Sequence, residues 1–377
     1  MEAQAVIERG LTYQVIKYLV LIGDKLLSNI HVEGTGKLKE LKRESDGRAL
    51  FLYASTHTSL FETTAVPATL YREKLPVPYA CMGDNLVKGE PWQRRVRKLG
   101  AFIMKRPETA GMRASRDSLV QGLEAHLEAG KDMLIFPEGS RTCIIRKGER
   151  GVFHPACFEQ VQAFQRSHLT EASRGSIVGD PELYIVPVTV SYSKVKDAKD
   201  MLESVAKAKT LKPRDVLKVI LKPVGHVYIS FGEPIRVMDY LDTNRKELAG
   251  MTRQRCLELV KILPVNVVGE ALMRETVECY DGGKINCDRV LFYITQVRNE
   301  LGWQYPEKFR RFTPQSSPEE IFRKGRGEEL VKDYERRTVM QALIEGRGLQ
   351  GTQQSLAKLY ASYIGHYMQK AMPATSS

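Results

Sequence analysis

A histidine and an acid five positions apart are the first residues whose types could carry chemistry. His57 and Glu62 lie in the segment Ser55 to Glu62 (STHTSLFE), directly after the apolar run Ala49 to Ala54. A histidine can take a proton from a hydroxyl group when a carboxylate holds its other ring nitrogen. Because residues five apart do not meet on a regular helix, we expect His57 in the turn before a helix and Glu62 in the first turns of that helix.

A structural interpretation of the same acid competes with the catalytic one. Ser59 and Glu62 have the spacing of a capping box, in which both side chains bind main-chain amides at the start of a helix. Glu62 would then stabilise the helix and take no part in catalysis. The residues alone leave both interpretations open.

Two cations follow a second short apolar run. Lys105 and Arg106 end the segment Gly100 to Arg106 (GAFIMKR). Such a pair at the end of a strand can bind a phosphate group, Arg through a planar fork and Lys as a point charge. A basic edge in contact with solvent is the alternative interpretation.

A glycine turn follows a third apolar run, within the segment Phe136 to Thr142 (FPEGSRT). Gly139 permits a tight turn that a side chain would obstruct. The turn would present Glu138 and Arg141 at the end of a strand. This motif is the most specific of the three, although a purely structural ion pair would use the same two side chains.

Short apolar runs that alternate with amphipathic segments must position these motifs. The pattern predicts an α/β fold with a mostly parallel sheet covered by helices. Ligands of such sheets bind beyond the carboxyl ends of the strands. The expected strands are Ala49 to Ala54, Phe102 to Met104, Met133 to Phe136, Tyr184 to Val190 and Val227 to Phe231.

The composition changes along the chain and indicates three regions. These are an N-terminal helical segment (1–45), an α/β domain (46–240) and a C-terminal helical region (241–377). Helical spacing predicts a first helix between Leu11 and Leu26. The polar stretch Gln165 to Pro181 shows no periodicity and predicts a long surface loop. Ser317 before Pro318 predicts the start of a late helix.

The charge of the chain indicates an anionic partner. The 377 residues carry a formal net charge of +12, which favours acidic phospholipid, a phosphorylated substrate or nucleic acid. No helix-turn-helix, zinc or RNP-like signature supports nucleic acid. The cysteines form no CxxC pair, and no metal site is predicted. No run approaches the roughly 18 apolar residues that span a membrane, so we expect any membrane contact to be peripheral.

In their order, the motifs resemble those of the glycerophosphate acyltransferase superfamily, most closely the bacterial glycerol-3-phosphate and peroxisomal dihydroxyacetone-phosphate acyltransferases. Those enzymes carry a histidine followed after four residues by an acid, then a basic block, an FPEG block and a VP strand. Four blocks in order are far less expected by chance than one. The matching residues are His57 to Glu62, Gly100 to Arg106, Phe136 to Gly139, and Val186 with Pro187, and Gly83 to Leu86 matches a GxNL segment before the basic block.

The resemblance implies a role for each site residue. It makes His57 the general base, Glu62 its partner, Lys105, Arg106 and Arg141 ligands of the acceptor phosphate, and Glu138 and Gly139 contacts to the acceptor. Two features depart from the family pattern. The acid is usually Asp, and the EG pair is usually followed by Gly or Thr rather than by Ser140 and Arg141.

The resemblance also implies the reaction. A fatty acyl group would pass directly from acyl-CoA or acyl-carrier protein to the hydroxyl of glycerol-3-phosphate, or of dihydroxyacetone phosphate, in phospholipid synthesis. No cofactor besides the thioester co-substrate is implied. The enzyme would be peripheral, at the cytoplasmic face of an anionic membrane surface. The alternatives are acylation of a lysophospholipid such as 1-acyl-glycerol-3-phosphate, and an inactive relative that binds lipid or phosphate.

Overall fold

The computed structural model describes the greater part of the chain. The described residues are 29–84, 89–98, 100–106, 110–139, 152–172, 181–195, 198, 225–278, 285–345 and 355–371. The helix expected between Leu11 and Leu26 lies outside them.

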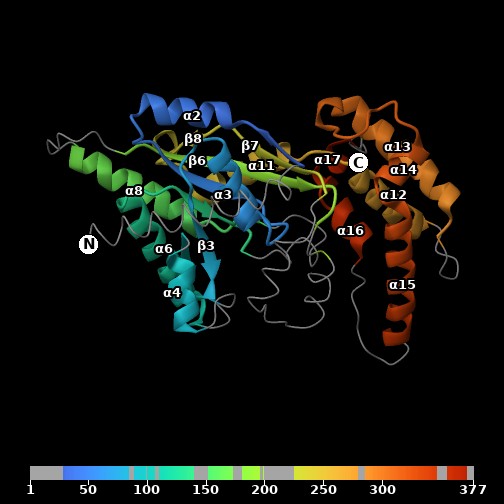
Figure 1. Ribbon diagram of the computed structural model, residues 1–377, viewed down its shortest axis with the longest axis horizontal. Helices are drawn as coiled ribbons and strands as arrows, with labels where there is room; N and C mark the ends of the chain where they lie inside the picture. The colour runs from blue at the N-terminus through green and yellow to red at the C-terminus, as the bar shows by residue number, and fades with distance from the viewer. Residues whose placement is uncertain are drawn as a thin grey trace. The chain divides into compact units, whose positions relative to one another are not determined.

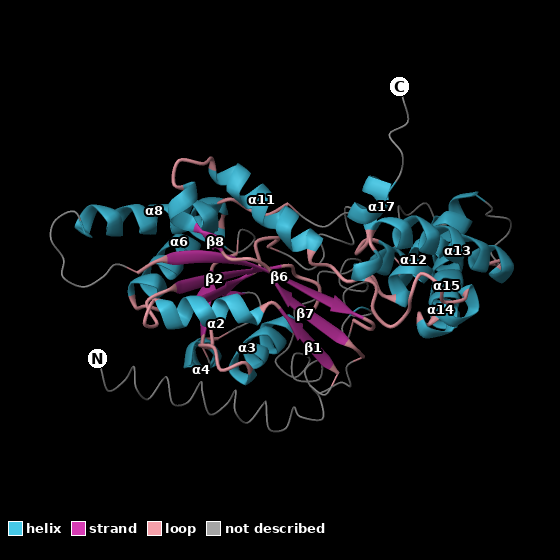
Figure 2. Ribbon diagram, turned by 90° about the horizontal axis from the view of Figure 1, so that it is seen from above, coloured by secondary structure: helices cyan, strands magenta, loops and turns pink. Residues whose placement is uncertain are grey.

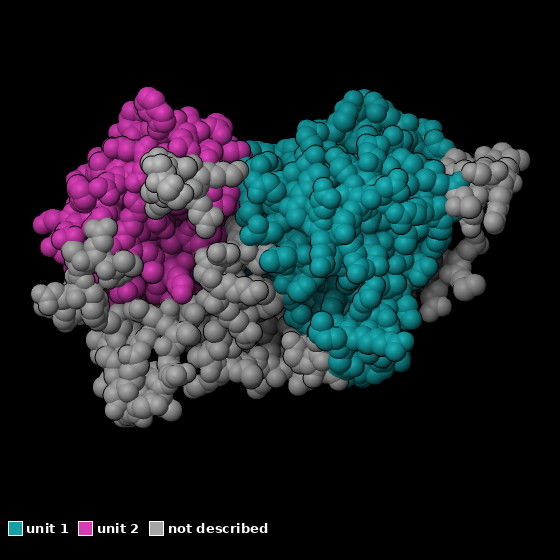
Figure 3. Space-filling model, turned by 180° about the vertical axis from the view of Figure 1, so that it is seen from behind, with its two compact units in different colours: residues 1–140, 152–190, 209–259 teal, residues 141–151, 191–208, 260–377 magenta. Residues whose placement is uncertain are grey.

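The chain divides into two compact units (Figure 3). The first comprises Met1–Ser140, Val152–Val190 and Lys209–Leu259, and the second Arg141–Gly151, Ser191–Ala208 and Val260–Ser377. The three-part division expected from the sequence stays a prediction, and the compact units cut the chain at other places. Residues 30–44, for example, supply a strand and a helix to the first unit.

The first unit is built on one mixed sheet (Figure 1). Its strands lie in the order β1-β7-β6-β2-β5-β3-β4, and β8 pairs with β6. The pairs β1 to β7, β6 to β2, β2 to β5, β5 to β3 and β3 to β4 are parallel, whereas β8 is antiparallel to β6. This arrangement confirms the predicted α/β class. The strands are β1 (Ile30–Glu33), β2 (Leu50–Ser55), β3 (Tyr79–Gly83), β4 (Ala101–Met104), β5 (Met133–Ile135), β6 (Leu183–Tyr192), β7 (Val227–Phe231) and β8 (Ile235–Arg236).

Helices cover both faces of this sheet. Figure 2 shows α2 and α3 on one side of the strands and α8 and α11 on the other. Alternate residues of β2 (Leu50, Leu52) pack with Leu123 of α6 and Phe158 of α8 in one buried apolar cluster. The helices of this unit are α2 (Thr35–Glu44), α3 (Glu62–Arg72), α4 (Glu90–Lys98), α6 (Met112–Glu128), α8 (Ala156–Ala172), the short 3₁₀ helix η2 (Val237–Tyr240) and α11 (Arg245–Glu258).

The prediction of a long loop from Gln165 to Pro181 is wrong for residues 165–172, which are helical. Helix α8 continues to Ala172, and residues 173–180 lie outside the described part. The side-chain Nε2 of Gln165 donates to the Pro181 carbonyl at 3.3 Å, and its Oε1 accepts from the main-chain amide of Leu183 at 2.9 Å. A buried polar side chain therefore ties this helix to the start of β6, a tertiary contact that periodicity does not reveal.

A buried ion pair holds the amino ends of the central strands. Asp132, directly before β5, is only 4% exposed. Its Oδ1 accepts from Lys42 Nζ of α2 at 2.9 Å and from the Phe51 amide of β2 at 2.9 Å. Burial raises the pKa of the Asp132 carboxyl, and the Lys42 ammonium opposes that rise. The pair therefore joins one covering helix to two adjacent strands.

The described part of the second unit is mainly helical, as predicted for the C-terminal region. Helix α14 begins as expected, because the Ser317 Oγ accepts from the Glu320 amide at 3.2 Å. Helices α12 and α16 approach closely at Gly269, where a Cβ would lie 2.7 Å from the Ala357 carbonyl oxygen. The helices are α12 (Pro264–Glu278), α13 (Cys287–Gln304), η3 (Pro306–Lys308), α14 (Pro318–Lys324), α15 (Gly327–Glu345), α16 (Leu356–Ala361) and α17 (Gly365–Ala371).

Within the described residues, no helix combines the length and the apolar character needed to cross a membrane.

Replacing Lys42 by Met should lower the free energy of unfolding by about 3 to 5 kcal/mol, because it leaves the buried Asp132 carboxylate without its cation. A carboxyl whose pKa is raised by folding is destabilising when ionised, so stability falls as pH rises through that pKa. The difference from the wild-type protein should therefore shrink at lower pH, where Asp132 is protonated. Urea unfolding curves at several pH values measure both effects.

Lys37→Met on the same helix is the matched control. Lys37 pairs with Glu40 at 2.9 Å, but both side chains are well exposed. Solvent screens such a pair, and its removal should leave stability nearly unchanged. Equal unfolding curves for the two variants would show that Asp132 does not depend on Lys42.

Candidate active site

The predicted motifs meet at one edge of the sheet. Strands β2, β5, β3 and β4 are adjacent and parallel, so their carboxyl ends lie together. His57 follows β2, the turn at Gly139 follows β5, Asp84 follows β3 and Arg106 follows β4. Two loops that are far apart in the sequence thus place His57 and Arg106 at the same edge of the sheet.

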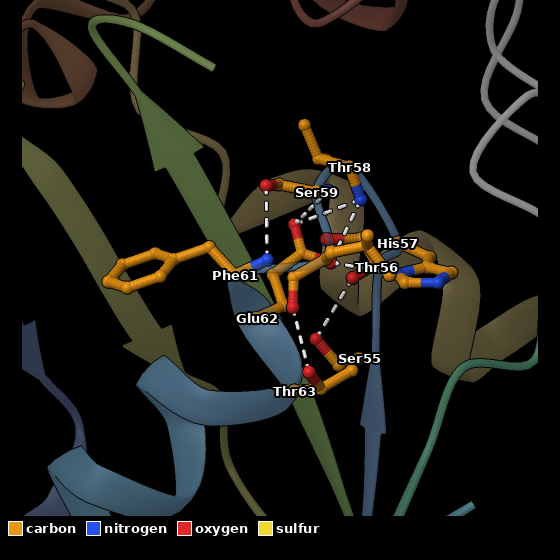
Figure 4. A network of polar contacts seen from close by, with 9 residues as sticks. Ser55, Thr56, His57, Thr58, Ser59, Phe61, Glu62 and Thr63 are labelled. Carbon is orange, nitrogen blue, oxygen red and sulfur yellow. Dashed lines mark hydrogen bonds and ion pairs between the residues drawn. The ribbon is translucent and has the colours of Figure 1, made fainter. Parts of the chain in front are cut away.

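His57 and Glu62 are in contact, as the first motif predicts. The His57 Nδ1 lies 3.1 Å from the Glu62 Oε2. The Glu62 side chain is fully buried and that of His57 is 13% exposed. His57 sits in the turn before α3, and Glu62 is the first residue of that helix. Figure 4 shows the contacts that converge on the carboxylate.

The same carboxylate also binds main-chain amides in the turn before the helix, as the capping interpretation requires. The Thr58 amide donates to both Glu62 oxygens at 2.9 Å, and the Ser59 amide donates to Oε1 at 3.2 Å. The Ser59 Oγ accepts from the Phe61 amide at 3.1 Å. In a regular capping box it would accept from the amide of Glu62, one residue later. The cap and the histidine contact therefore coexist in one side chain, and one does not exclude the other.

The His57 ring is held from a second side by an aromatic ring. It stacks on Phe136 with centroids 4.1 Å apart and 25° between the planes. When Nδ1 carries a hydrogen, that hydrogen is donated to Glu62, and Nε2 is then the basic nitrogen. The two contacts fix both the orientation of the ring and the nitrogen that can take a proton.

Arg106 reaches the glycine turn, whereas Lys105 is exposed. The Arg106 Nη1 donates to the Gly139 carbonyl at 2.6 Å, and its main-chain amide donates to the Asp84 Oδ1 at 3.2 Å. The Lys105 amide donates to the Ser118 Oγ at 3.2 Å. Of the two predicted cations, the structure brings Arg106 to the turn that carries Glu138.

The turn after β5 needs its glycine. Gly139 has a φ of +71°, and its amide donates to the Phe136 carbonyl at 2.9 Å. A Cβ at this position would lie 3.2 Å from the ring of His154, whose amide donates to the Pro137 carbonyl. Glu138 in the same turn is buried, with 2% exposed. Arg141 lies outside the described residues, so its role stays a prediction.

Three residues of this edge were not singled out from the sequence. Asp84 stands inside the GxNL segment and Phe136 opens the FPEG block, but neither of these two side chains had an assigned contact. His154 carries no local signal. It reaches the turn only because the chain returns to Pro137 before α8 begins.

Gly139→Ala should destabilise the protein more than Gly130→Ala. Both glycines have positive φ, +71° and +64°, and an alanine in that conformation costs about 1 to 2 kcal/mol. A Cβ at Gly139 also meets His154, whereas nothing lies within 4 Å of a Cβ at Gly130. Urea unfolding measures both losses.

Adding His154→Ala should recover the extra loss at Gly139 and leave the loss at Gly130 unchanged, since coupling requires contact. Equal losses for the two single variants would contradict the packing of His154 against the turn.

Comparison with known proteins agrees with these motifs. Residues 29–191 match the Acyltransferase family. Glycerol-3-phosphate acyltransferases of Alteromonas mediterranea and Haemophilus influenzae are 26% and 28% identical over 60% of this chain. Human mitochondrial glycerol-3-phosphate acyltransferase 1 is 23% identical over 61% of it. The chain spans only 26% to 27% of the length of these relatives. Residues 29–191 thus match an acyltransferase domain, and this match and the similar proteins support the resemblance of the motifs to the glycerophosphate acyltransferase superfamily.

Proposed function

We propose that this chain transfers a fatty acyl group from a thioester, acyl-CoA or acyl-carrier protein, to the hydroxyl of glycerol-3-phosphate. The observation that carries the proposal is the buried Glu62 carboxylate 3.1 Å from the His57 ring, on the sheet edge that also holds Arg106. The names of the similar proteins support the acceptor. The product would enter phospholipid synthesis.

His57 acts as the general base in this proposal. The acceptor hydroxyl loses its proton to the Nε2 of His57 while its oxygen attacks the thioester carbonyl carbon. The resulting tetrahedral oxyanion collapses, the carbon–sulfur bond breaks, and the leaving thiolate takes the proton from His57. The acyl ester and the free thiol are the products, and no covalent enzyme intermediate is required.

Glu62 makes this proton transfer easier by stabilising the imidazolium. Its negative charge lies beside Nδ1, where positive charge develops as Nε2 is protonated. The two amides that bind the carboxylate restrict its rotation, so the electrostatic contact is in place before substrate binds. Such preorganisation is worth more in a buried site than in water.

The phosphate of the acceptor is assigned to the cations of the same motifs. Arg106 is held at the turn by the Gly139 carbonyl, and a guanidinium binds phosphate through a bidentate fork. We assign Arg141 and Lys105 to the same phosphate, and Glu138 and Gly139 to the rest of the acceptor. Dihydroxyacetone phosphate and 1-acyl-glycerol-3-phosphate share the phosphate, so rates with all three acceptors identify the substrate.

The proposed reaction takes place at a membrane surface. Its product is an amphiphile, and the chain carries a net charge of +12, which attracts anionic phospholipid. We therefore propose peripheral attachment to the cytoplasmic face of an anionic membrane.

Glu62→Gln tests the proposed pair. The amide oxygen of Gln can still accept from Thr58 and Ser59, so the cap survives, but the charge that supports the imidazolium is lost. We expect kcat to fall strongly with little change in stability. His57→Ala should reduce turnover by ~100-fold to 10,000-fold. Initial rates with labelled acyl-CoA and glycerol-3-phosphate measure both.

Ser59→Ala is the control for capping. It removes the acceptor of the Phe61 amide and should lower stability by about 0.5 to 2 kcal/mol while turnover of the folded enzyme persists. Near-normal turnover in Glu62→Gln would refute the pair and reduce Glu62 to a helix cap.

Arg141→Ala should raise the KM for the acceptor and leave the KM for the thioester nearly unchanged. A charge-assisted bond to phosphate is worth ~1.5 to 3 kcal/mol, which corresponds to roughly tenfold to a hundredfold in KM. Arg141→Lys should recover only part of the loss, because Lys lacks the fork. Equal effects on both substrates would show that Arg141 is structural.

A further inference from the structure

Helix α13 exposes two large aromatic side chains to solvent. Trp303 is 90% exposed and Phe292 is 57% exposed, and both rank among the few large apolar side chains exposed in the described part of the chain. Other residues of α13, such as Val290, Ile294 and Leu301, are fully buried. One face of the helix is therefore buried in the apolar core of the unit. The two exposed aromatic residues lie outside that core.

The two aromatic residues share one face of the helix. They are 11 positions apart, or about three turns and about 16 Å along the axis. Gln296 and Asn299 complete the same line at helical spacing, and neither carries a charge. We call Phe292, Gln296, Asn299 and Trp303 the α13 strip. It is an uncharged line with an aromatic side chain at each end.

Positive charges gather at the Trp303 end of the α13 strip. Lys308, Arg310 and Arg311 follow the helix closely, and Glu307 is the single acid among them. The Lys308 Nζ lies 3.9 Å from the Glu307 Oε1, so this pair is compensated and the two arginines give the segment its net positive charge. This segment lies against the end of α13, because a Cβ on the neighbouring Gly302 would be 3.6 Å from Phe309 and 3.0 Å from Pro314.

Two charged side chains of α13 lie beside the strip, those of Arg298 and Glu300, and Arg298 adds to the positive charge at this end. The Arg298 Nη1 donates to the Ser316 carbonyl at 2.6 Å, and its Nη2 donates to the Asn299 side chain at 2.8 Å. These contacts hold the guanidinium beside the strip without cancelling its charge. Glu300, by contrast, accepts from Arg274 through both oxygens at 2.8 Å, so its negative charge is compensated.

We propose that the α13 strip is a docking surface for the headgroup region of an anionic phospholipid bilayer. The amphipathic ring of Trp303 is favoured at the interface, and the apolar ring of Phe292 enters the boundary with the acyl chains. Lys308, Arg310 and Arg311 contact the phosphate groups of the lipids. Charge complementarity favours this occupant over a protein partner. The choice of a lipid surface rests on the proposed function, because the proposed product is a lipid.

The strip is narrow, so the predicted attachment is reversible. Two aromatic side chains bury far less apolar area than a complete amphipathic helix. Attachment must then draw much of its strength from the charges, which salt screens beyond about 10 Å at 0.1 M. Binding should be strong to anionic vesicles at low salt and weak to neutral vesicles at any salt.

Tryptophan fluorescence of the full chain tests the contact directly. The chain contains two tryptophans, Trp92 and Trp303, so Trp92→Phe leaves Trp303 as the single reporter. With vesicles of phosphatidylglycerol and phosphatidylcholine in equal amounts, its emission should shift to the blue and be quenched by brominated acyl chains. Pure phosphatidylcholine vesicles, or about 0.5 M salt, should abolish both changes.

Flotation of variants measures the contribution of each group. Trp303→Ala and Phe292→Ala should each weaken partition into anionic vesicles by about tenfold. Arg311→Gln should weaken partition into anionic vesicles and leave partition into neutral vesicles unchanged. Met112→Ala removes another exposed apolar side chain, on α6 of the first unit, and should have no effect. Thermal unfolding checks that each variant is folded.

Two outcomes would overturn the proposal. If the protein floats while the Trp303 emission stays unchanged, another surface makes the membrane contact. If the emission shifts with protein concentration in the absence of vesicles, the strip is an interface between two copies of the chain.

The membrane contact and the enzymatic activity can fail separately. Turnover of a water-soluble short-chain acyl-CoA in detergent does not require the strip, so it should be normal in Phe292→Ala and Trp303→Ala. Turnover without vesicle binding would disprove the docking surface alone. Vesicle binding through Trp303 without any acyl transfer would disprove the proposed function and leave the docking surface intact.

Discussion

The buried carboxylate of Glu62 is the group on which the candidate site depends. A carboxylate removed from water persists only when hydrogen bonds or positive charge compensate it. The main-chain amides of Thr58 and Ser59 and the imidazole of His57 supply that compensation. The requirement for compensation also orients the histidine, so the contacts that start α3 are the contacts that prepare a base. In this motif, local stability and chemistry are two consequences of one burial.

The parallel sheet extends this local arrangement to residues distant in sequence. His57 follows β2 and stacks on Phe136 after the neighbouring β5. Arg106 is bound at its amide by Asp84, after β3, and at its guanidinium by the Gly139 carbonyl. The buried Lys42 and Asp132 pair stabilises the opposite ends of the same central strands. The Lys42 and Asp132 pair and the groups assigned to chemistry thus lie at opposite ends of the same strands.

The sequence predicted the features that depend on local pattern. The apolar runs gave the five expected strands, including the wholly buried β2, because a strand covered on both faces must be apolar throughout. The short strands β1, β3 and β8 were not predicted. Strands β1 and β8 contain polar residues, and β3 is only partly buried, so none of the three shows a wholly apolar buried run, and their pairing depends on the rest of the sheet. The contact of His57 with Glu62 was predicted, whereas Asp84 and His154 were missed, because only the folded chain brings them to Arg106 and Gly139.

The geometry of the turn before α3 explains why position 62 holds the longer Glu rather than Asp. Glu62 is the first residue of α3, and its carboxylate must reach back to the amides of Thr58 and Ser59 and also to the ring of His57. An Asp at this position would be shorter by one carbon–carbon bond, about 1.5 Å, and hydrogen bonds of 2.9 to 3.2 Å could not all stretch by that amount. An Asp at position 62 would therefore require a turn that lies closer to the acid. In this chain, the longer Glu and the conformation of residues 57–61 are matched to each other, which accounts for an acid that departs from the usual pattern and still contacts the histidine.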